Sequence, residues 1–311
     1  MAFDARVQIP VKRYIKFIGL AFTTLTGLAC LIIVVMLAII LGNIAIHGGP
    51  RLSWEFISSE PRAGMTQGGI FPAIFGTAAL VLLMTLAVVP LGVAAAIYLH
   101  EYARQGSQLV HVVRLALANL AGVPAIVFGL FGLGFFIQFV GGGIDRAFFG
   151  GALAFGQPSI LWAALTLAVL TLPTVVVATE EALRAVPTSY REVAYAAGAT
   201  RWQVVRHIVL PQSVGGILTG TILAVSRGAG EVAPIMFTGA AYYLPYLPKK
   251  LNDQFMELGY HIYVMTTQSP DVEATKPILY ATVLVLLVLT FALNLVAVVV
   301  RSRIRRRLRA A

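Results

Sequence analysis

The sequence has little charge and almost no cysteine. Only 12% of its 311 residues are charged, and Cys30 is the one cysteine, so no internal disulfide can form. No lysine is followed by serine or threonine, which excludes a GxxxxGK(S/T) phosphate-binding loop. Neither a GxSxG elbow nor an HExxH pair is present, and the five histidines are scattered. We therefore expect no catalytic residue, no metal site and no ATP hydrolysis by this chain itself.

Apolar residues are abundant instead. They make up 59% of the chain, and the mean hydropathy is +0.86. A soluble domain cannot bury that much apolar surface, so we expect an integral membrane protein. The net charge of +10 would suggest a nucleic-acid partner in a soluble chain. Here the cations cluster at the ends of apolar segments, which favours membrane lipids as their partner and argues against nucleic acid.

Six apolar segments are long enough to cross the roughly 30 Å of hydrocarbon in a bilayer. The first is too long for the core of a signal peptide, so we expect it to be a retained transmembrane helix. The sequence thus predicts an all-α integral membrane protein with six transmembrane helices. They are placed near Phe17–Ile46, Ile70–Leu99, Leu115–Val140, Ser159–Ala178, Ser213–Gly239 and Pro277–Val300.

The distribution of lysine and arginine predicts the orientation. With the N-terminus in the cytoplasm, the inner segments carry 16 of these residues and the outer segments carry 6. This asymmetry places both termini in the cytoplasm. The chain then divides into residues 1–69 (tail, first transmembrane helix and first external loop), residues 70–300 (five transmembrane helices and a cytoplasmic loop at 179–211) and a basic cytoplasmic tail at 301–311. Anionic lipids explain this tail sufficiently, and a partner-binding role is the alternative.

The polar loop 179–211 predicts two short helices. A serine or threonine three residues before a glutamate or glutamine forms a capping box that starts a helix, and glycine or proline ends one. These signals are Ser189 with Glu192, Thr200 with Gln203, Gly198 and Pro211. They predict helices Tyr190–Ala197 and Arg201–Val209 with a bend at Gly198, with Trp202, Val205 and Ile208–Val209 toward the membrane-side core and Arg201 and Arg206 outward. On spacing alone, a solvated loop that merely connects two spans is the alternative.

A second amphipathic helix is predicted on the outer side, between the last two spans. Leu251, Phe255, Leu258 and Ile262 recur there at helical spacing, with polar residues between them. The helix is either a gate or docking surface at the outer mouth or a packing helix at the membrane interface.

An ionisable pair lies in the predicted fifth span, Ser213–Gly239. Arg227 is close to its centre, where an unpaired arginine costs at least ~2.5–3.5 kcal/mol. Glu231 is one turn further, on the same face of the helix. In one interpretation the two charges neutralise each other and pin neighbouring spans together. In the other, Arg227 offers bidentate donors to a tetrahedral oxyanion, while Glu231 holds Arg227 and could accept a proton from a protonated phosphate.

Small residues recur every four positions on a neighbouring face of the same span. They are Gly216, Gly220, Ala224 and Gly228. A stripe of this kind lets another helix approach closely in a membrane. We therefore expect one side of the fifth span to pack and an adjoining side to carry the charges into an interior pathway.

The polar loop also carries a motif that resembles a known family. Glu192-x-Ala194-x3-Gly198, then nine residues and Ile208-x-Leu210-Pro211, resembles the EAA loop of permeases of ABC importers. The one departure from the family pattern is Val193 in place of the middle alanine. The resemblance implies that this elbow inserts into a groove on a separate ATP-binding subunit and transmits its closure.

Three further stretches resemble permeases of phosphate importers, and the last of them is similar to the PstA type. They are Gly68-Gly69-Ile70-x-Pro72-Ala73-Ile74-x-Gly76-Thr77, Arg227-Gly228-Ala229-Gly230-Glu231-Val232-Ala233-Pro234, and Tyr260-His261-Ile262-Tyr263 with the following Thr267-Gln268. Gly228 and Val232 depart from the family pattern. The resemblance covers most of the chain, from about Gly68 to Leu284, whereas the first span and the C-terminal tail carry no specific motif.

This resemblance implies a function and a set of partners. The chain would be the permease subunit of an ATP-driven phosphate importer in a bacterial inner membrane. Its partners would be a PstC-like second permease, a dimer of ATP-binding subunits that holds ATP and magnesium, and an extracytoplasmic phosphate-binding protein. The alternatives are a permease for another oxyanion, such as sulfate, molybdate or phosphonate, and a standalone ion-driven carrier or channel, which has no need of an EAA elbow.

Overall fold

The computed structural model describes residues 9–65, 67–104, 106–269 and 271–310. Within these ranges the regular structure is helical apart from two short antiparallel strands, β1 (Pro61–Arg62) and β2 (Gln67–Gly68). Six of the described helical segments are long and apolar enough to cross a membrane, which confirms the predicted number of spans. They are Ile18–Arg51, Phe71–Tyr102, Ala125–Phe148, Ile160–Arg184, Arg201–Gly228 and Val272–Ile304.

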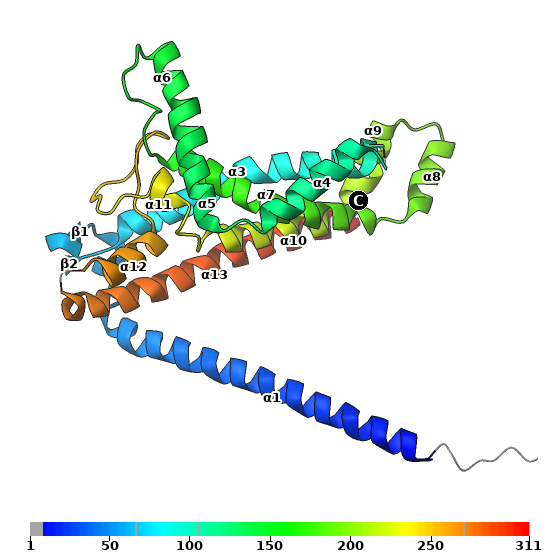
Figure 1. Cartoon of the computed structure of the whole chain (residues 1–311), viewed down its shortest axis with the longest axis horizontal. Coiled ribbons are helices and arrows are strands. Elements are labelled where there is room, and N and C mark those ends of the chain that lie inside the picture. The colour runs from blue at the N-terminus through cyan, green and yellow to red at the C-terminus, as the bar shows by residue number, and fades with distance from the viewer. Residues whose placement is uncertain (1–8, 66, 105, 270, 311) are drawn as a thin grey trace, which may run out of the picture.

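Three helices form the core of the molecule: α3 (Phe71–Ile97), α7 (Ile160–Arg184) and α10 (Leu210–Gly228). They lie side by side in Figure 1 and share one cluster of buried aliphatic side chains, to which α3 contributes Leu80 and Met84. Since these three helices bury apolar side chains against one another, they make a rigid unit that positions the segments at both of its ends.

Two long helices lie outside this core: α1 (Ile9–Gly48) and α13 (Val272–Ala310). Helix α13 packs along α10. Helix α1 diverges from the other helices in Figure 1 and touches α13 near its own end, where Gly48 lies against the backbone of Tyr280. Most of its apolar side chains are therefore exposed to the surroundings, as expected of a helix that faces lipid or another chain.

The third span begins later than the sequence predicts, so the placement at Leu115–Val140 is wrong at its start. Helix α4 (Gln108–Ala121) is a separate helix that packs beside α7, and it ends before Pro124. Proline disfavours the helical conformation of the residue before it, so it separates two helices here instead of kinking one. The span itself comprises α5 (Ala125–Phe131), the π-helical segment η4 (Gly132–Gly141) and α6 (Gly142–Phe148).

The fifth span ends earlier than predicted. Helix α10 stops at Gly228, and the next helix is the single turn α11 (Ile235–Thr238). Pro234 has no backbone N–H and restricts the residue before it, while Gly228 and Gly230 have low helix propensity. Ser213–Gly239 is thus a helix followed by a break, and the prediction of one continuous span is wrong.

Shorter segments gather at two ends of the molecule (Figure 1). One end, called the α12 end below, carries α2 (Trp54–Ser58), the β1–β2 hairpin, α11 and α12 (Leu258–Thr267). The other, called the α8–α9 end, carries α8 (Thr188–Ala196), α9 (Arg201–Val204) and the end of α13. Since α10 extends between these ends, it connects them physically.

The amphipathic helix predicted from Leu251 is confirmed only in its second half. Helix α12 begins at Leu258, and Leu251 lies in a loop. Phe255 pairs with Ala240 in an isolated parallel bridge instead of entering the helix. The helix starts at Leu258 because the carboxylate of Glu257 accepts the first free backbone N–H groups.

Candidate coupling and pathway sites

The elbow at the α8–α9 end begins at Pro187. The proline ring fixes φ at −58°, a value that suits the start of a helix, and α8 begins at the next residue, Thr188. Ser189 therefore lies inside the helix and not in front of it, and no side chain caps its start. The predicted capping box of Ser189 with Glu192 is wrong for this reason.

The bend and the second capping box follow the sequence. Gly198 has φ +84°, and its N–H donates to the carbonyl of Tyr195 at 2.9 Å. Such a left-handed residue closes a helix with little strain only when it is glycine. The next helix starts at Thr200, whose N–H donates to Oε1 of Gln203 at 2.8 Å while the Gln203 N–H donates to Thr200 Oγ1 at 3.4 Å. Both predictions are confirmed.

Pro211 does not end the second helix, in contrast to the prediction. Helix α9 continues through a π-helical turn, η5 (Val205–Val209), directly into α10. Pro211 directly follows the π-helical turn and lies in the first turn of α10. The elbow is therefore joined to the fifth span by continuous helix.

The π-helical turn also changes which side chains face the bundle. Val204 and Val209 are buried, whereas Trp202 is 56% exposed, so the predicted burial of Trp202 is wrong. Because a π-helix has a wider turn, residues five apart share one face, which brings Val204 and Val209 together. Arg201 and Arg206 are exposed, as predicted.

Apolar side chains cover the outside of the elbow. We call this patch the elbow surface; it consists of Tyr190, Val193, Tyr195 and Trp202, which are all exposed. Val193, the departure from the family motif, is 71% exposed, so its extra volume enlarges the surface and does not disturb the core. Of the predicted coupling residues, Ala194 is buried, Glu192 and Gly198 are exposed, and Ile208, Leu210 and Pro211 are half-buried. Large exposed apolar side chains on an element of this kind are candidates for contact with another chain.

Arg227 and Glu231 form an ion pair where α10 ends. Arg227 Nε lies 3.2 Å from Glu231 Oε1, and the two side chains are 42% and 22% exposed. Leu223, one turn earlier than Arg227, is also exposed. The sequence predicts the pair near the centre of a span. Because α10 stops at Gly228, the pair sits at a helix end instead. In the described part of the chain, this face of α10 is open.

The stripe of small residues lies on the packed side of α10. A side chain at Gly216 or Gly220 would meet Ala182 or Ala178 of α7, and one at Gly228 would meet Met84 of α3. Ala224 is buried in the shared core. Helix α10 thus has one side packed against α3 and α7 and another side that carries the open ion pair. With a rise of about 1.5 Å per residue, Arg227 lies roughly 25 Å along α10 from Leu210, where this helix begins.

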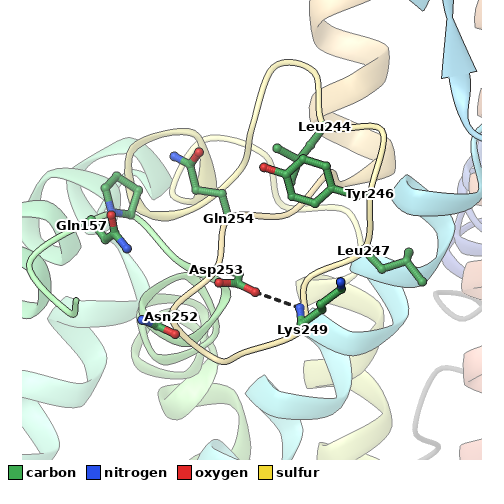
Figure 2. A pocket seen from close by; sticks show the side chains of 9 residues that line it. Gln157, Leu244, Tyr246, Leu247, Lys249, Asn252, Asp253 and Gln254 are labelled. Carbon is green, nitrogen blue, oxygen red and sulfur yellow. Dashed lines mark hydrogen bonds between the residues drawn. The ribbon is translucent and has the colours of Figure 1, made fainter. Parts of the chain in front are cut away.

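A cavity of about 410 Å³ with a mixed polar and apolar lining lies at the α12 end (Figure 2). One carboxylate organises its wall, since Asp253 Oδ2 accepts the backbone N–H groups of Lys249 and Lys250 at 2.8 and 2.9 Å. Asn252 ties the wall to the loop before α7 by donating to the carbonyl of Ala154 at 3.0 Å. No local pattern predicts this cavity, because its residues come together only through the folding of two loops.

Two buried titratable groups lie beside this cavity's loop, at the start of α12 and outside the spans. The Glu257 carboxylate accepts the N–H groups of Gly259 and Tyr260 at 2.8 and 2.6 Å. Burial raises the pKa of Glu257 to about 7, against the opposing effect of these hydrogen bonds and of the Thr77 hydroxyl. Burial lowers the pKa of His261 to about 4, and its Nδ1 has no hydrogen-bond partner in the described residues.

Sequence reasoning missed an ion pair that holds the elbow in place. The guanidinium of Arg191, in α8, lies 2.7 Å from the carboxylate of Glu101, which follows α3. The two residues are 90 positions apart, so no local spacing could have indicated the pair. The only sequence signal is a glutamate and an arginine at the ends of apolar segments.

Comparison with known proteins identifies the family. Residues 88–309 match the family described as "Binding-protein-dependent transport system inner membrane component". The chain belongs to this family. It is 32% identical over 266 residues to the probable ABC transporter permease protein YqgI of Bacillus subtilis, covering 81% of this chain and 85% of that protein.

Several relatives are phosphate transport system permease proteins named PstA. The one from Pasteurella multocida is 35% identical over 216 residues, which are 69% of this chain and 71% of that protein. The one from Yersinia pestis is 39% identical over 184 residues, 59% of this chain and 57% of that protein. The chain is therefore an ABC permease of the PstA type.

Solved structures share the fold at low sequence identity. A bacterial alginate ABC transporter, solved in complex with an alginate pentasaccharide-bound periplasmic protein, matches with a TM-score of 0.66 at 17% identity, covering 94% of this chain and 97% of that one. The MetNI methionine ABC transporter in an inward-facing conformation matches with a TM-score of 0.52 at 18% identity, covering 76% and 94%. These likenesses show the fold of an ABC transporter permease.

Proposed function

We propose that this chain is one of two permease subunits of an ATP-driven importer of inorganic phosphate. The observation that carries the proposal is the construction of α10. The helix is continuous with the elbow at one end and ends beside the Arg227–Glu231 pair at the other. A single rigid element therefore links a docking surface to a charged surface.

The elbow surface binds a separate ATP-binding subunit. Its exposed tyrosine, valine and tryptophan side chains suit insertion into an apolar groove, and its outline matches the EAA motif of importer permeases. Because the sequence has no phosphate-binding loop, ATP and magnesium are held by a dimer of those partner subunits. The coupling residues in this proposal are Glu192, Ala194, Gly198, Ile208, Leu210 and Pro211.

The translocation pathway lies between this chain and a second, PstC-like permease. The Arg227–Glu231 pair lies on an open face of α10, so a pathway lined by it is completed by another chain. Arg227 offers planar donors to the passing anion, and Glu231 holds the guanidinium in place. An extracytoplasmic phosphate-binding protein delivers the anion at the α12 end.

The orientation in a bacterial inner membrane follows from charge. The excess of lysine and arginine belongs to the α8–α9 end and the two termini. This excess supports a cytoplasmic position for that end and for both termini. Six spans are consistent with this, because an even number returns the chain to the side where it started.

The substrate is tested by reconstitution of the complex that co-purifies with this chain. Vesicles with external binding protein are assayed for ATP-dependent uptake of phosphate, sulfate, molybdate and a phosphonate. We expect uptake, and stimulation of ATP hydrolysis, with phosphate alone. Uptake of one of the other oxyanions in its place would reassign the substrate, and transport without any co-purified ATPase would support a standalone carrier.

A further inference from the structure

The side chain of Arg191 joins three separate segments at the α8–α9 end. Its Nη2 donates to Oε1 of Glu101 at 2.7 Å, and its Nε lies 3.3 and 3.4 Å from the two carboxylate oxygens. Nη1 donates to the carbonyl of Val186 at 2.7 Å, and Nη2 also donates to the carbonyl of Leu183 at 2.9 Å. All three nitrogens of the guanidinium are thus used.

This ion pair is shielded from water. The side chains of Arg191 and Glu101 are 13% and 8% exposed. A nearby pair, Arg114 with Glu180, is more open, at 36% and 13%, and has one hydrogen bond of 3.2 Å. Removing Arg191 leaves the carboxylate of Glu101 in surroundings that solvate it poorly, beside the imidazole of His100 at 3.8 Å, so the contact is hard to break.

The bonds add a direct connection between the elbow and the end of α3, which the elbow does not reach through the neighbouring backbone. Glu101 lies in η3 (Tyr98–Tyr102), the π-helical turn that continues α3. Leu183 is in the last turn of α7, and its carbonyl accepts the backbone N–H of Val186 at 3.3 Å in addition to the guanidinium. The elbow is therefore joined to α10 by continuous helix and to α7 by the short link of residues 185–187. Ala194 of α8 shares a buried apolar cluster with Leu99 of η3, and Arg191 adds the polar contact to Glu101.

Only arginine has the geometry for this role. Its planar fork reaches a carboxylate and two carbonyls at once, whereas lysine presents a single compact ammonium group. Neutralisation of Glu101 leaves the shape of the contact but removes the charge that holds it.

We propose that Arg191 is a positioning residue that makes α3 move together with the elbow. When the partner subunit displaces the elbow surface, the clamp formed by Arg191 and Glu101 carries the displacement to α3, and η5 carries it to α10. Met84 of α3 lies against Gly228, one residue from Arg227, so both routes converge on the ion pair of the pathway. This inference rests on the proposed function.

The test measures phosphate uptake and ATP hydrolysis in the same vesicles, with the complete co-purified complex. Arg191→Gln and Glu101→Gln are expected to retain ATP hydrolysis and partner binding, while phosphate moved per ATP falls about fivefold or more. For Arg191→Lys, the phosphate moved per ATP is expected to lie between the value of the two glutamine variants and that of the wild type. Arg184→Gln is the matched control, because Arg184 is an exposed arginine next to Leu183, and its ratio is expected to stay at the wild-type value.

The double variant separates a clamp from two independent residues. Arg191→Gln with Glu101→Gln is expected to be no worse than either single change, because both remove the same contact. A wild-type ratio in Arg191→Gln, loss of the ATP-binding subunit from that variant, or additive losses in the double variant would each overturn the proposal. Failure of the wild-type complex to take up phosphate would instead overturn the proposed function, whatever Arg191 does.

Discussion

At the scale of single residues, Arg227 is the side chain on which the proposed transport depends most. It is partly exposed on an open face and held by one carboxylate, so its remaining donors are free to meet an anion. We expect Arg227→Gln to lower phosphate uptake at least about tenfold, the loss of a charge-assisted hydrogen bond, while the complex still assembles. Uptake by reconstituted vesicles checks this.

Two further variants make the Arg227 experiment specific. Arg227→Lys keeps the charge but not the fork, so we expect partial uptake. Leu223→Ala, one turn earlier on the same open face, is the control and is expected to transport normally. Equal losses in Leu223→Ala and Arg227→Gln would mean that the face matters for packing against another chain and that the charge has no special role.

The small residues of α10 give a prediction with an internal control. A methyl group at Gly216 would collide with Ala182 of α7, so Gly216→Ala is expected to destabilise the protein by about 1–3 kcal/mol. The adjacent Gly215 has nothing within 4 Å of the same position, so Gly215→Ala is expected to be stabilising by about 0.5–1 kcal/mol. Thermal unfolding in detergent separates the two, and similar shifts in both would contradict the packing of α10 on α7.

At the scale of elements, the start of α12 contains two groups with opposite pH dependence. Glu257 has a pKa of about 7 in place of 4.5, so it binds a proton more tightly when folded, and its contribution to stability is lost as the pH rises from 4.5 to 7. His261 has a pKa of about 4 in place of 6.5, so its contribution is lost as the pH falls from 6.5 to 4.

Between pH 4.5 and 6.5 the two effects oppose each other, so the wild type is expected to show little change in stability with pH. Glu257→Gln removes one effect, and its stability is expected to rise with pH over this window. His261→Gln removes the histidine effect, and the stability of this variant is expected to fall as the pH rises over the same window. Each unit of pKa shift corresponds to about 1.4 kcal/mol. Unfolding midpoints measured across the window decide this, and parallel profiles for the two variants would refute it.

At the scale of the whole molecule, the elbow surface is expected to be covered by the partner subunit. In a Cys30→Ser background, cysteines at Val193 and Trp202 report access to a maleimide. We expect labelling to be slowed at least about tenfold when the ATP-binding subunits are present, because interface cores exclude water. Leu251→Cys, exposed at the α12 end, serves as the control and is expected to label at the same rate in both cases. Unchanged labelling at both elbow positions would remove the elbow surface as the docking site.

Local signals in the sequence determined much of this molecule. The lengths of the apolar runs are enough to predict six spans, because hydrocarbon thickness sets the length that a helix needs. Gly198 predicts the bend, since a left-handed backbone favours glycine, and Thr200 with Gln203 predicts a helix start, since each satisfies the N–H of the other. The spacing of the elbow motif and the ionisable pair also lie in the sequence itself.

The tertiary structure alone decided how these parts meet. Trp202 is exposed, and the helix continues through a π-helical turn past Pro211, although the local sequence predicts a buried tryptophan and a helix end. The break after Gly228 moves Arg227 from the middle of a span to the end of a helix on an open face. Arg191 meets Glu101 across 90 residues, and such pairing is set by the packing of α8 against α3 and α7, which no local pattern encodes.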